Sequence, residues 1–293
     1  MLHHGSSLPM PPLRVVVIGA GGFVGGAVCR RVAAAGVPVL ALTRREVDLL
    51  AADAADALAI LLRPGDSVVA AAAMAPVKTA AMLRDNMVMT AAMISALSRV
   101  EAAHVVNIGS DAIYGDCDHP MIESAVAAPT SLHGAMHLAR ELMFQAELKA
   151  PLATLRPTLI YGAGDPHNGY GPNSFRRKAN RGEDIVLFGE GEERRDHVAI
   201  DDVAELVWRI LAHRSTGALN AATGVVTSFN EVARQVIAFS GREVTLSGSP
   251  RRGPMPHNGY RAFDPAATLA AFPDFRYTPL AEGLRLAQQE EFG

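Results

Sequence analysis

A glycine-rich turn near the start of the chain limits the possible folds more than any other feature of the sequence. The turn follows the apolar run 13–18 and places Gly19, Gly22 and Gly25 at the spacing G-x-x-G-x-x-G, and a helical pattern begins at residue 23. In a strand–turn–helix unit such glycines permit the tight turn, let a pyrophosphate approach the backbone and allow the helix to pack against the strand. The free N–H groups and the dipole of the helix N-terminus favour the same anionic ligand. The sequence therefore predicts a dinucleotide site at this turn.

The remainder of the first half alternates short apolar runs with helical patterns. Strands that alternate with helices of about ten or more residues predict right-handed β-α-β crossovers and a parallel sheet. After residue 161, glycines and prolines crowd a loop and shorter elements mix. We therefore expect an α/β fold, with a Rossmann-type doubly wound parallel sheet over 13–165 and a smaller C-terminal α/β substrate domain over 166–293. The expected strands are 13–18, 37–42, 67–71, 104–108 and 152–155, and the expected helices are 23–35, 54–62, 77–99 and 131–149.

The composition of the chain limits which binding partners and which cellular compartment we expect. The 293 residues include 27 Lys and Arg against 30 Asp and Glu, a net charge of −3, so no basic excess points to a nucleic-acid partner. The two cysteines cannot build a disulfide framework, and the longest apolar run, 68–75, is far shorter than the ~20 residues of a membrane span. The segment 1–12 contains two histidines and three prolines, and we expect it to be a disordered leader or tag. These features are typical of a cytoplasmic protein without a membrane partner.

The end of the second strand bears on the choice of cofactor. An NAD site usually offers an acidic residue to the ribose hydroxyls at this point, but here Thr43 is followed by Arg44 and Arg45. An arginine pairs well with a 2′-phosphate. The pattern therefore favours NADP over NAD, unless the two arginines are only solvated loop charges.

Ordered blocks further along make the chain resemble a known family. The blocks 108–115, 155–162 and 195–202 are similar to S-S-x-x-V-Y-G, L-R-x-x-x-V-Y-G and R-D-F-V-H-V-D-D. With the glycine turn, they resemble the extended short-chain dehydrogenase/reductase family, whose members are NAD(P)-dependent nucleotide-sugar epimerases, dehydratases and 4-keto reductases. The resemblance covers nearly the whole chain from Leu13. It implies hydride transfer at a hydroxyl or keto carbon of a nucleotide-linked sugar, the return of about 196–222 to the first domain, and a possible homodimer through the helices 77–99 and 131–149.

The resemblance also implies which residues bind the ligands. Those on the cofactor side are Gly19, Gly22, Phe23, Val24, Gly25, Thr43, Arg44, Arg45, Asp48, Leu49, Ala71, Ala72, Ala73, Asn86, His137 and Pro157. Those on the substrate side are Asp111, Asn173, Arg177, Arg195 and Arg252. An arginine fork suits the phosphates of a nucleotide diphosphate, although surface ion pairing is the alternative role for each of these arginines.

The sequence departs from the family at its catalytic pair. The family uses Y-x-x-x-K on a helix, in which the tyrosine is the acid/base and the lysine binds the ribose. Here His133 stands at the tyrosine position and His137 at the lysine position, while Ser110 occupies the family's catalytic Ser/Thr position. The register is held by four flanking residues that fit the pattern, Pro129, Ser131, Gly134 and Glu141.

Several roles remain open for two histidines that share a helix face at i and i+4. His133 can exchange a proton with a substrate hydroxyl or ketone that Ser110 orients, while His137 binds the nicotinamide ribose. Alternatively, the family's catalysis is lost and the chain is a catalytically degenerate dinucleotide-binding protein, a sensor or interaction protein. A third alternative is an enzyme of unrelated chemistry. The spacing also suits two zinc ligands, but no third ligand is evident, so no metal site is predicted.

Overall fold

The strand that precedes the glycine turn lies inside a six-stranded parallel sheet in the computed structural model, which describes residues 2–293. The strand order is β2-β1-β3-β4-β5-β9, and all neighbouring strands are parallel. The chain therefore extends the sheet from β1 in both directions, which confirms the predicted Rossmann-type doubly wound topology. The strands are β1 (Val15–Ile18), β2 (Val39–Leu42), β3 (Ser67–Ala70), β4 (His104–Ile108), β5 (Leu152–Pro157) and β9 (Gly217–Ala221).

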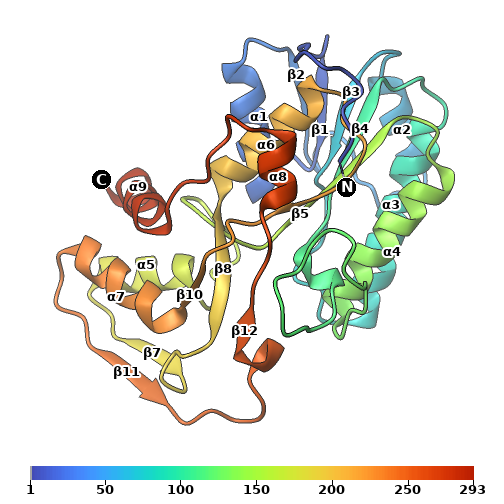
Figure 1. Ribbon diagram of the computed structural model, residues 1–293. Helices are drawn as coiled ribbons and strands as arrows, with labels where there is room; N and C mark the ends of the chain where they lie inside the picture. Colours follow the sequence, from blue (N-terminus) through green and yellow to red (C-terminus); the bar gives the residue numbers. More distant parts are fainter. Residues whose placement is uncertain (1) are drawn as a thin grey trace.

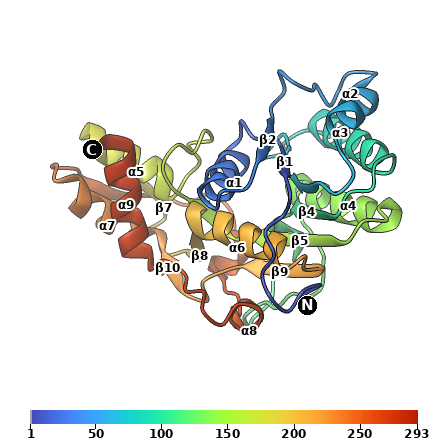
Figure 2. The same ribbon diagram turned by 90° about the horizontal axis from the view of Figure 1, so that it is seen from above.

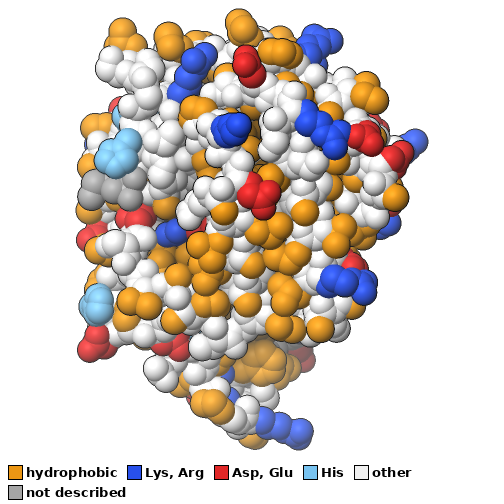
Figure 3. Space-filling model, turned by 90° about the vertical axis from the view of Figure 1, so that its right-hand side faces the viewer, with side chains coloured by type: hydrophobic (Ala, Val, Ile, Leu, Met, Phe, Trp, Pro, Cys, Tyr) orange, Lys and Arg blue, Asp and Glu red, His pale blue; other side chains and the backbone are white. Residues whose placement is uncertain are grey.

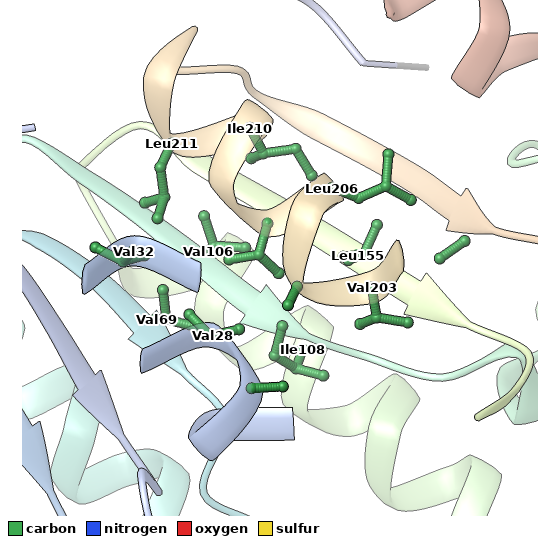
Figure 4. Packing of buried hydrophobic residues seen from close by; sticks show 14 of the residues in the cluster. Val28, Val32, Val69, Val106, Ile108, Leu155, Val203, Leu206, Ile210 and Leu211 are labelled. Atoms are coloured by element: carbon green, nitrogen blue, oxygen red, sulfur yellow. The ribbon is translucent and has the colours of Figure 1, made fainter. Parts of the chain in front are cut away.

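Helices cover both faces of this sheet (Figure 1, Figure 2). Helices α1 (Phe23–Ala34) and α6 (Ile200–Ala212) lie on one face, and α2 (Ala54–Leu61), α3 (Ala80–Leu97) and α4 (Leu132–Glu147) lie on the other. The side chains of β1 alternate between the two apolar clusters, as expected of a strand buried on both faces. Figure 4 shows the first cluster, in which α1 and α6 pack over the strands through Val28, Val32, Val69, Val106, Leu155, Val203 and Ile210.

Helix α3 begins three residues later than the expected range 77–99. Thr79 has an extended backbone, and its side chain accepts a hydrogen bond from the Met82 N–H, which makes it the N-cap. The helix contains 18 residues. Even so, none of the helices formed by residues 2–293 is sufficiently long and apolar to cross a membrane.

The second part of the molecule is built around β8 (Arg194–Ala199). This strand pairs with β6 (Leu159–Tyr161), β10 (Val226–Ser228) and β12 (Tyr260–Arg261), while β7 (Ile185–Phe188) and β11 (Leu246–Ser249) form a separate parallel pair. A third apolar cluster lies between these strands and three of the helices around them. The remaining helices are α5 (Pro172–Arg181), α7 (Phe229–Ser240), α8 (Ala266–Ala271) and α9 (Leu280–Phe292), with the 3₁₀ turns η1 (Asp111–Ile113) and η2 (Pro256–Gly259).

The segment before β1 is ordered, and the expectation of a disordered leader is wrong for residues 2–12; Met1 lies outside the described residues. His3 forms a β-bridge with Thr216, next to β9. The His4 ring bonds to Ser215 Oγ at 2.8 Å and to the Ala271 carbonyl at 2.9 Å, and it stacks on His213 with ring centroids 4.5 Å apart. These partners are more than 200 residues away in sequence, so local composition could not predict the docking.

Candidate active site

Two neighbouring cavities lie at the carboxyl ends of the parallel strands, where ligands of open α/β sheets commonly bind. The first, of about 400 Å³, lies between the glycine turn, the residues after β2 and the segment 71–74. The second, of about 660 Å³, lies between the same turn, η1, the start of α4 and loops of the second part. The two cavities share Gly22, Ala71 and Ala73 as lining residues, so together they form one elongated cleft.

The glycine turn has no room for side chains at two of its positions. Gly19 has a φ of +95°, and a Cβ on it would lie 2.5 Å from the Ala72 backbone nitrogen. A Cβ on Gly25 would collide with the Gly19 carbonyl oxygen. Gly22 is the N-cap of α1 and offers no side-chain cap, so the first N–H groups of that helix remain available to a ligand.

The residues after β2 form a turn closed by Glu46. Its Oε2 accepts hydrogen bonds from the Thr43 N–H at 2.8 Å and from the Thr43 hydroxyl at 2.6 Å. Sequence reasoning missed Glu46, although the spacing T-x-x-E is the pattern of a capping box. Arg44 pairs with Asp48 at 3.1 Å, and the pKa of Asp48 is lowered mainly by the hydrogen bond from the Leu50 N–H and next by Arg44.

Most of the residues expected at the cofactor line this cleft. The first cavity contains Gly19, Gly22, Thr43, Arg44, Asp48, Leu49, Ala71, Ala72 and Ala73, and the second contains Gly22, Phe23, Val24, Gly25, Ala71, Ala73, His137 and Pro157. Arg45 and Asn86 line neither cavity. Asn86 is buried; its Oδ1 accepts from the Met74 N–H at 2.9 Å, and its Nδ2 donates to the Met82 carbonyl at 2.8 Å. It therefore supports the 71–74 segment from behind.

His133 and His137 both line the second cavity, on one face of α4. Their rings meet edge to face, with centroids 4.7 Å apart. Ser110 and Asp111 line the same cavity from the end of β4 and η1. The Nδ1 atom of each histidine is buried and has no hydrogen-bond partner within residues 2–293, so for His133 the other ring nitrogen, Nε2, is the one open to the cavity.

The start of α4 is fixed by local contacts that explain this placement. The Ser131 hydroxyl caps the helix by accepting from the Gly134 N–H at 3.1 Å. A Cβ on Gly134 would collide with the Ala112 carbonyl oxygen, so only glycine lets the first turn of α4 approach η1. Further along, Glu141 pairs with Arg156 at 2.7 Å, which ties α4 to β5. The histidine face is therefore held close to Ser110.

Burial keeps both imidazoles uncharged at neutral pH. Desolvation lowers the pKa of His133, the charge of Asp111 opposes this effect, and His167 adds to it. Desolvation lowers the pKa of His137 well below its ordinary value, with smaller contributions from His133 and Arg140. A neutral imidazole has one nitrogen lone pair that can accept a proton. The arrangement is therefore suited to a general base rather than to a fixed cation.

The structure separates the substrate-side candidates into two groups. Asp111 and Arg195 line the second cavity, with Arg195 Nη2 3.9 Å from Asp111 Oδ2. Asn173 and Arg177 do not line it, because their side chains turn toward the 162–165 loop. Asn173 Nδ2 donates to Asp165 at 3.0 Å, and Arg177 pairs with Glu291 at 2.8 Å. Arg252 is exposed and also lies outside both cavities.

Three polar residues at or behind the cleft were not predicted: Asp116 and His257, which line the second cavity, and Arg261, which lies outside both cavities. Arg261 of β12 is buried and donates from Nε to Asp111 Oδ2 at 3.0 Å and from Nη1 to Asp116 Oδ1 at 3.1 Å. His257 Nδ1 lies 2.5 Å from the same Asp116 oxygen, and His257 lines the second cavity. No sequence motif surrounds these residues, and their partners lie 141 to 150 positions away. Within residues 2–293, no three His, Cys, Asp or Glu side chains are arranged to hold a metal ion.

The chain is similar in sequence to parts of two curated proteins. It is 34% identical to dTDP-L-rhamnose 4-epimerase of Burkholderia thailandensis over 138 residues, which are 44% of this chain and 38% of that protein. It is 28% identical to ADP-L-glycero-D-manno-heptose-6-epimerase of Alkalilimnicola ehrlichii over 195 residues, which are 60% and 59%. The matches thus span less than two thirds of either relative.

A solved structure and a family model each match a larger share of the chain than these two relatives do. The fold is similar to that of UDP-glucose 4-epimerase from Thermus thermophilus, solved in complex with NAD, with a TM-score of 0.83 at 23% identity over 96% of this chain and 99% of the other. Residues 15–222 match the sequence model of the NAD dependent epimerase/dehydratase family. This stretch is more than half of the chain and includes the glycine turn, Ser110 and both histidines. The family resemblance found in the sequence is thereby confirmed, and the chain belongs to the NAD dependent epimerase/dehydratase family.

Proposed function

We propose that this chain is an NAD(P)-dependent enzyme that acts on a nucleotide-linked sugar by hydride transfer at a hydroxyl or keto carbon, with His133 in place of the family's usual tyrosine. The observation that carries the proposal is the second cavity. There a neutral imidazole with an open ring nitrogen lies in the same cavity as the Ser110 hydroxyl and the Arg195 guanidinium. The relatives reported above are named for sugars linked to dTDP, ADP or UDP, which supports a substrate of that class.

The cleft fits a dinucleotide. The glycines let the turn pack closely against the 71–72 segment and the start of α1, the N-terminus of α1 is free for phosphates, and the two cavities are continuous along the turn. We propose that Thr43, Arg44, Asp48 and Leu49 bind the adenosine end and that His137 and Pro157 flank the nicotinamide end. Arg44 and Arg45 favour NADP over NAD, because an exposed guanidinium at this turn can pair with a 2′-phosphate.

The chain's own residues supply the proton chemistry. A dinucleotide bound in the cleft would supply hydride transfer to and from the substrate carbon. His133 Nε2 accepts the proton of the substrate hydroxyl, whose oxygen Ser110 holds by a hydrogen bond. In the reducing direction His133 gives the proton back to the same oxygen. Arg195 holds the diphosphate of the substrate with its planar fork.

A second candidate function is a catalytically degenerate binding protein. The observation that favours it is that both imidazoles are neutral, so the pair provides no cation for the ribose. Such a protein binds the dinucleotide but does not turn over any sugar nucleotide.

The experiment that separates these candidates measures binding and turnover on the same preparations. NAD⁺ and NADP⁺ affinities are measured by calorimetry, and turnover is followed with a panel of UDP-, dTDP- and ADP-linked sugars. We expect turnover by the native chain, tighter binding of NADP⁺ by about tenfold, and loss of turnover with retained cofactor affinity in His133→Ala. If only the double variant His133→Tyr with His137→Lys turns over, the binding-protein candidate holds. Equal turnover by native and His133→Ala chains refutes the imidazole mechanism.

A further inference from the structure

A fully buried arginine lies beneath the cleft. Arg140 stands on α4 three residues after His137, and its side chain is 0% exposed. Its guanidinium donates to the Ala70 carbonyl at 2.6 Å, to the Ala72 carbonyl, and from Nε to Asn107 Oδ1 at 2.7 Å. All three acceptors are uncharged.

No carboxylate among residues 2–293 lies within ion-pair distance of this guanidinium. The neighbouring Glu141 pairs with Arg156 at 2.7 Å instead. Burial lowers the pKa of Arg140 to about 10, which leaves the group charged at neutral pH. A buried charge without a counterion is costly for folding, so its retention calls for a role that a neutral side chain does not fill.

The acceptors of Arg140 connect it directly to the cleft. Ala70 is the last residue of β3, and Ala72 belongs to the segment that lines the first cavity. The Ala72 nitrogen is the atom that a Cβ on Gly19 would approach to 2.5 Å. The arginine therefore fixes the backbone against which the glycine turn packs.

We propose that Arg140 is the fixed positive charge of the dinucleotide site: a positioning residue that holds the 70–73 segment against the glycine turn and attracts the anionic dinucleotide into the cleft. The inference rests on the dinucleotide binding proposed above. Arg140 is then a permanent cation behind His133 and His137, which are themselves uncharged.

The charge of Arg140 also acts on His137. The charged or titratable groups around the histidine pair are His133 and Arg140 on α4, Asp111 on η1, and His167 from the loop after β6. Of these, Arg140 is a permanent cation, and it opposes protonation of His137. Removing or neutralising this charge should therefore make His137 easier to protonate, even when no ligand is bound.

Two variants separate the charge of Arg140 from its packing. Arg140→Met removes the charge and the hydrogen bonds. Asn107→Asp keeps Arg140 and its contacts but places a carboxylate at the position of Asn107 Oδ1, 2.7 Å from Arg140 Nε. The matched control is Arg14→Met. Arg14 pairs with Asp66 at 2.5 Å just before β1 and β3 begin, so this ion pair lies at the amino ends of the strands, away from the cleft at their carboxyl ends.

The readouts are the dissociation constant for NADP⁺ and the titration midpoint of His137 by ¹⁵N NMR in the ligand-free chain. Both variants are expected to weaken NADP⁺ binding by about tenfold and to raise the His137 midpoint, while Arg14→Met changes neither. If Arg140→Met does not fold, Asn107→Asp decides the question alone. Unchanged affinity and an unchanged His137 midpoint in Asn107→Asp overturn the inference while the proposed function stands. A native chain that binds no dinucleotide refutes the proposed function and the inference together.

Discussion

Two nitrogen atoms on one face of α4 lack the partners that buried polar atoms normally have. Nδ1 of His133 and Nδ1 of His137 are buried without a hydrogen bond, so no side chain or carbonyl among residues 2–293 fixes which nitrogen carries the proton in either ring. In most catalytic histidines a carboxylate or carbonyl holds this tautomer. The pair is therefore able to present either a lone pair or an N–H to the cavity, which suits a residue that both accepts and returns a proton.

The dependence of turnover on pH tests the role of His133 directly. Because burial lowers the pKa of His133, the neutral base persists to a pH below 6.5. Oxidation of a sugar hydroxyl should therefore be constant from about pH 7 to 8 and fall only as pH drops through the lowered pKa. His133→Ala should reduce turnover by about 10²–10⁴-fold and abolish that limb. The exposed His119, changed to Ala, is the control, and a limb that survives in His133→Ala contradicts the assignment.

At the scale of elements, the cleft depends on β12, a strand of only two residues. Arg261 on this strand donates to Asp111 and Asp116 on the opposite side of the second cavity. It also donates to the Asp111 backbone carbonyl at 2.6 Å. The Arg261 side chain therefore connects the second part of the molecule to η1, the turn that directly follows Ser110.

Removing this connection should destabilise the molecule strongly. Arg261→Met leaves the buried Asp111 carboxylate without its closest cation, and breaking such a pair costs about 3–5 kcal/mol of unfolding free energy. Arg261→Lys should recover only part of the loss, because an ammonium group cannot reproduce the fork. Urea unfolding measures both. Arg276→Met, on an exposed loop, should cost about 0.5 kcal/mol or less, and an equal loss in the two methionine variants would show that the contacts of Arg261 are not responsible.

The elements also show what the sequence could predict. Local patterns found β4 at its observed bounds, 104–108, and found the glycine turn because its chemistry is contained within seven neighbouring residues. The start of α3 was missed because the Thr79 cap outweighs the apolar pattern that begins at residue 77. Arg140, Arg261 and Glu46 were missed as site residues. For the two arginines the reason is physical: their acceptors lie 33 to 150 positions away and are in part backbone carbonyls, which no local motif encodes.

The whole molecule has an apolar face that bears on its assembly. Figure 3 shows apolar side chains gathered on the side where α3 and α4 lie. Val88 on α3 is 44% exposed and Leu142 on α4 is 56% exposed. An apolar surface shared by two long helices is typical of a symmetric contact between two copies of a chain.

We predict a homodimer formed through α3 and α4. Sedimentation should give twice the chain mass of 30.9 kDa, and Leu142→Glu with Val88→Glu should give the single chain, because each charge would be buried unpaired at the contact. Val225→Glu is the control, since Val225 is also apolar and exposed (64%) but belongs to the second part of the molecule. A native chain that sediments as a monomer would refute the prediction.

Acid should unfold the molecule through its buried histidines. Burial lowers the pKa of five of them, His104, His133, His137, His197 and His257, and that of His197 to about 3. Between its lowered pKa and the ordinary pKa near 6.5, each of these histidines binds more protons in the unfolded chain than in the folded one. Each of these histidines therefore lowers the free energy of unfolding as pH decreases below 6.5, and for His197, whose pKa is about 3 in the folded chain, the decrease is about 1.4 kcal/mol per pH unit.

The test is urea unfolding of the native chain and of His197→Leu at several pH values from 7 to 4. His197→Leu should show a shallower decrease, by about 1.4 kcal/mol per pH unit, because the leucine has no proton to bind. His119→Gln should keep the native slope. A slope in His197→Leu identical to the native one would mean that His197 is already protonated in the folded state.

The path of the chain through the sheet has a consequence for how this molecule can be divided and varied. After β5 the chain leaves the sheet, builds β6, α5, β7 and β8, and then returns to add α6 and β9. A fragment cut near residue 165 would leave β5 with an open edge and expose the apolar face that α6 covers. The excursion 159–199 leaves the six-stranded sheet and returns to it at adjacent points, because β6 runs beside β8. Changes within it do not open that sheet, provided that β7 and β8 keep their pairing with β10, β11 and β12. The molecule is thus one framework with an insert, and a new substrate preference can arise in the insert while the first cavity, which is lined only by residues up to Met89, stays intact.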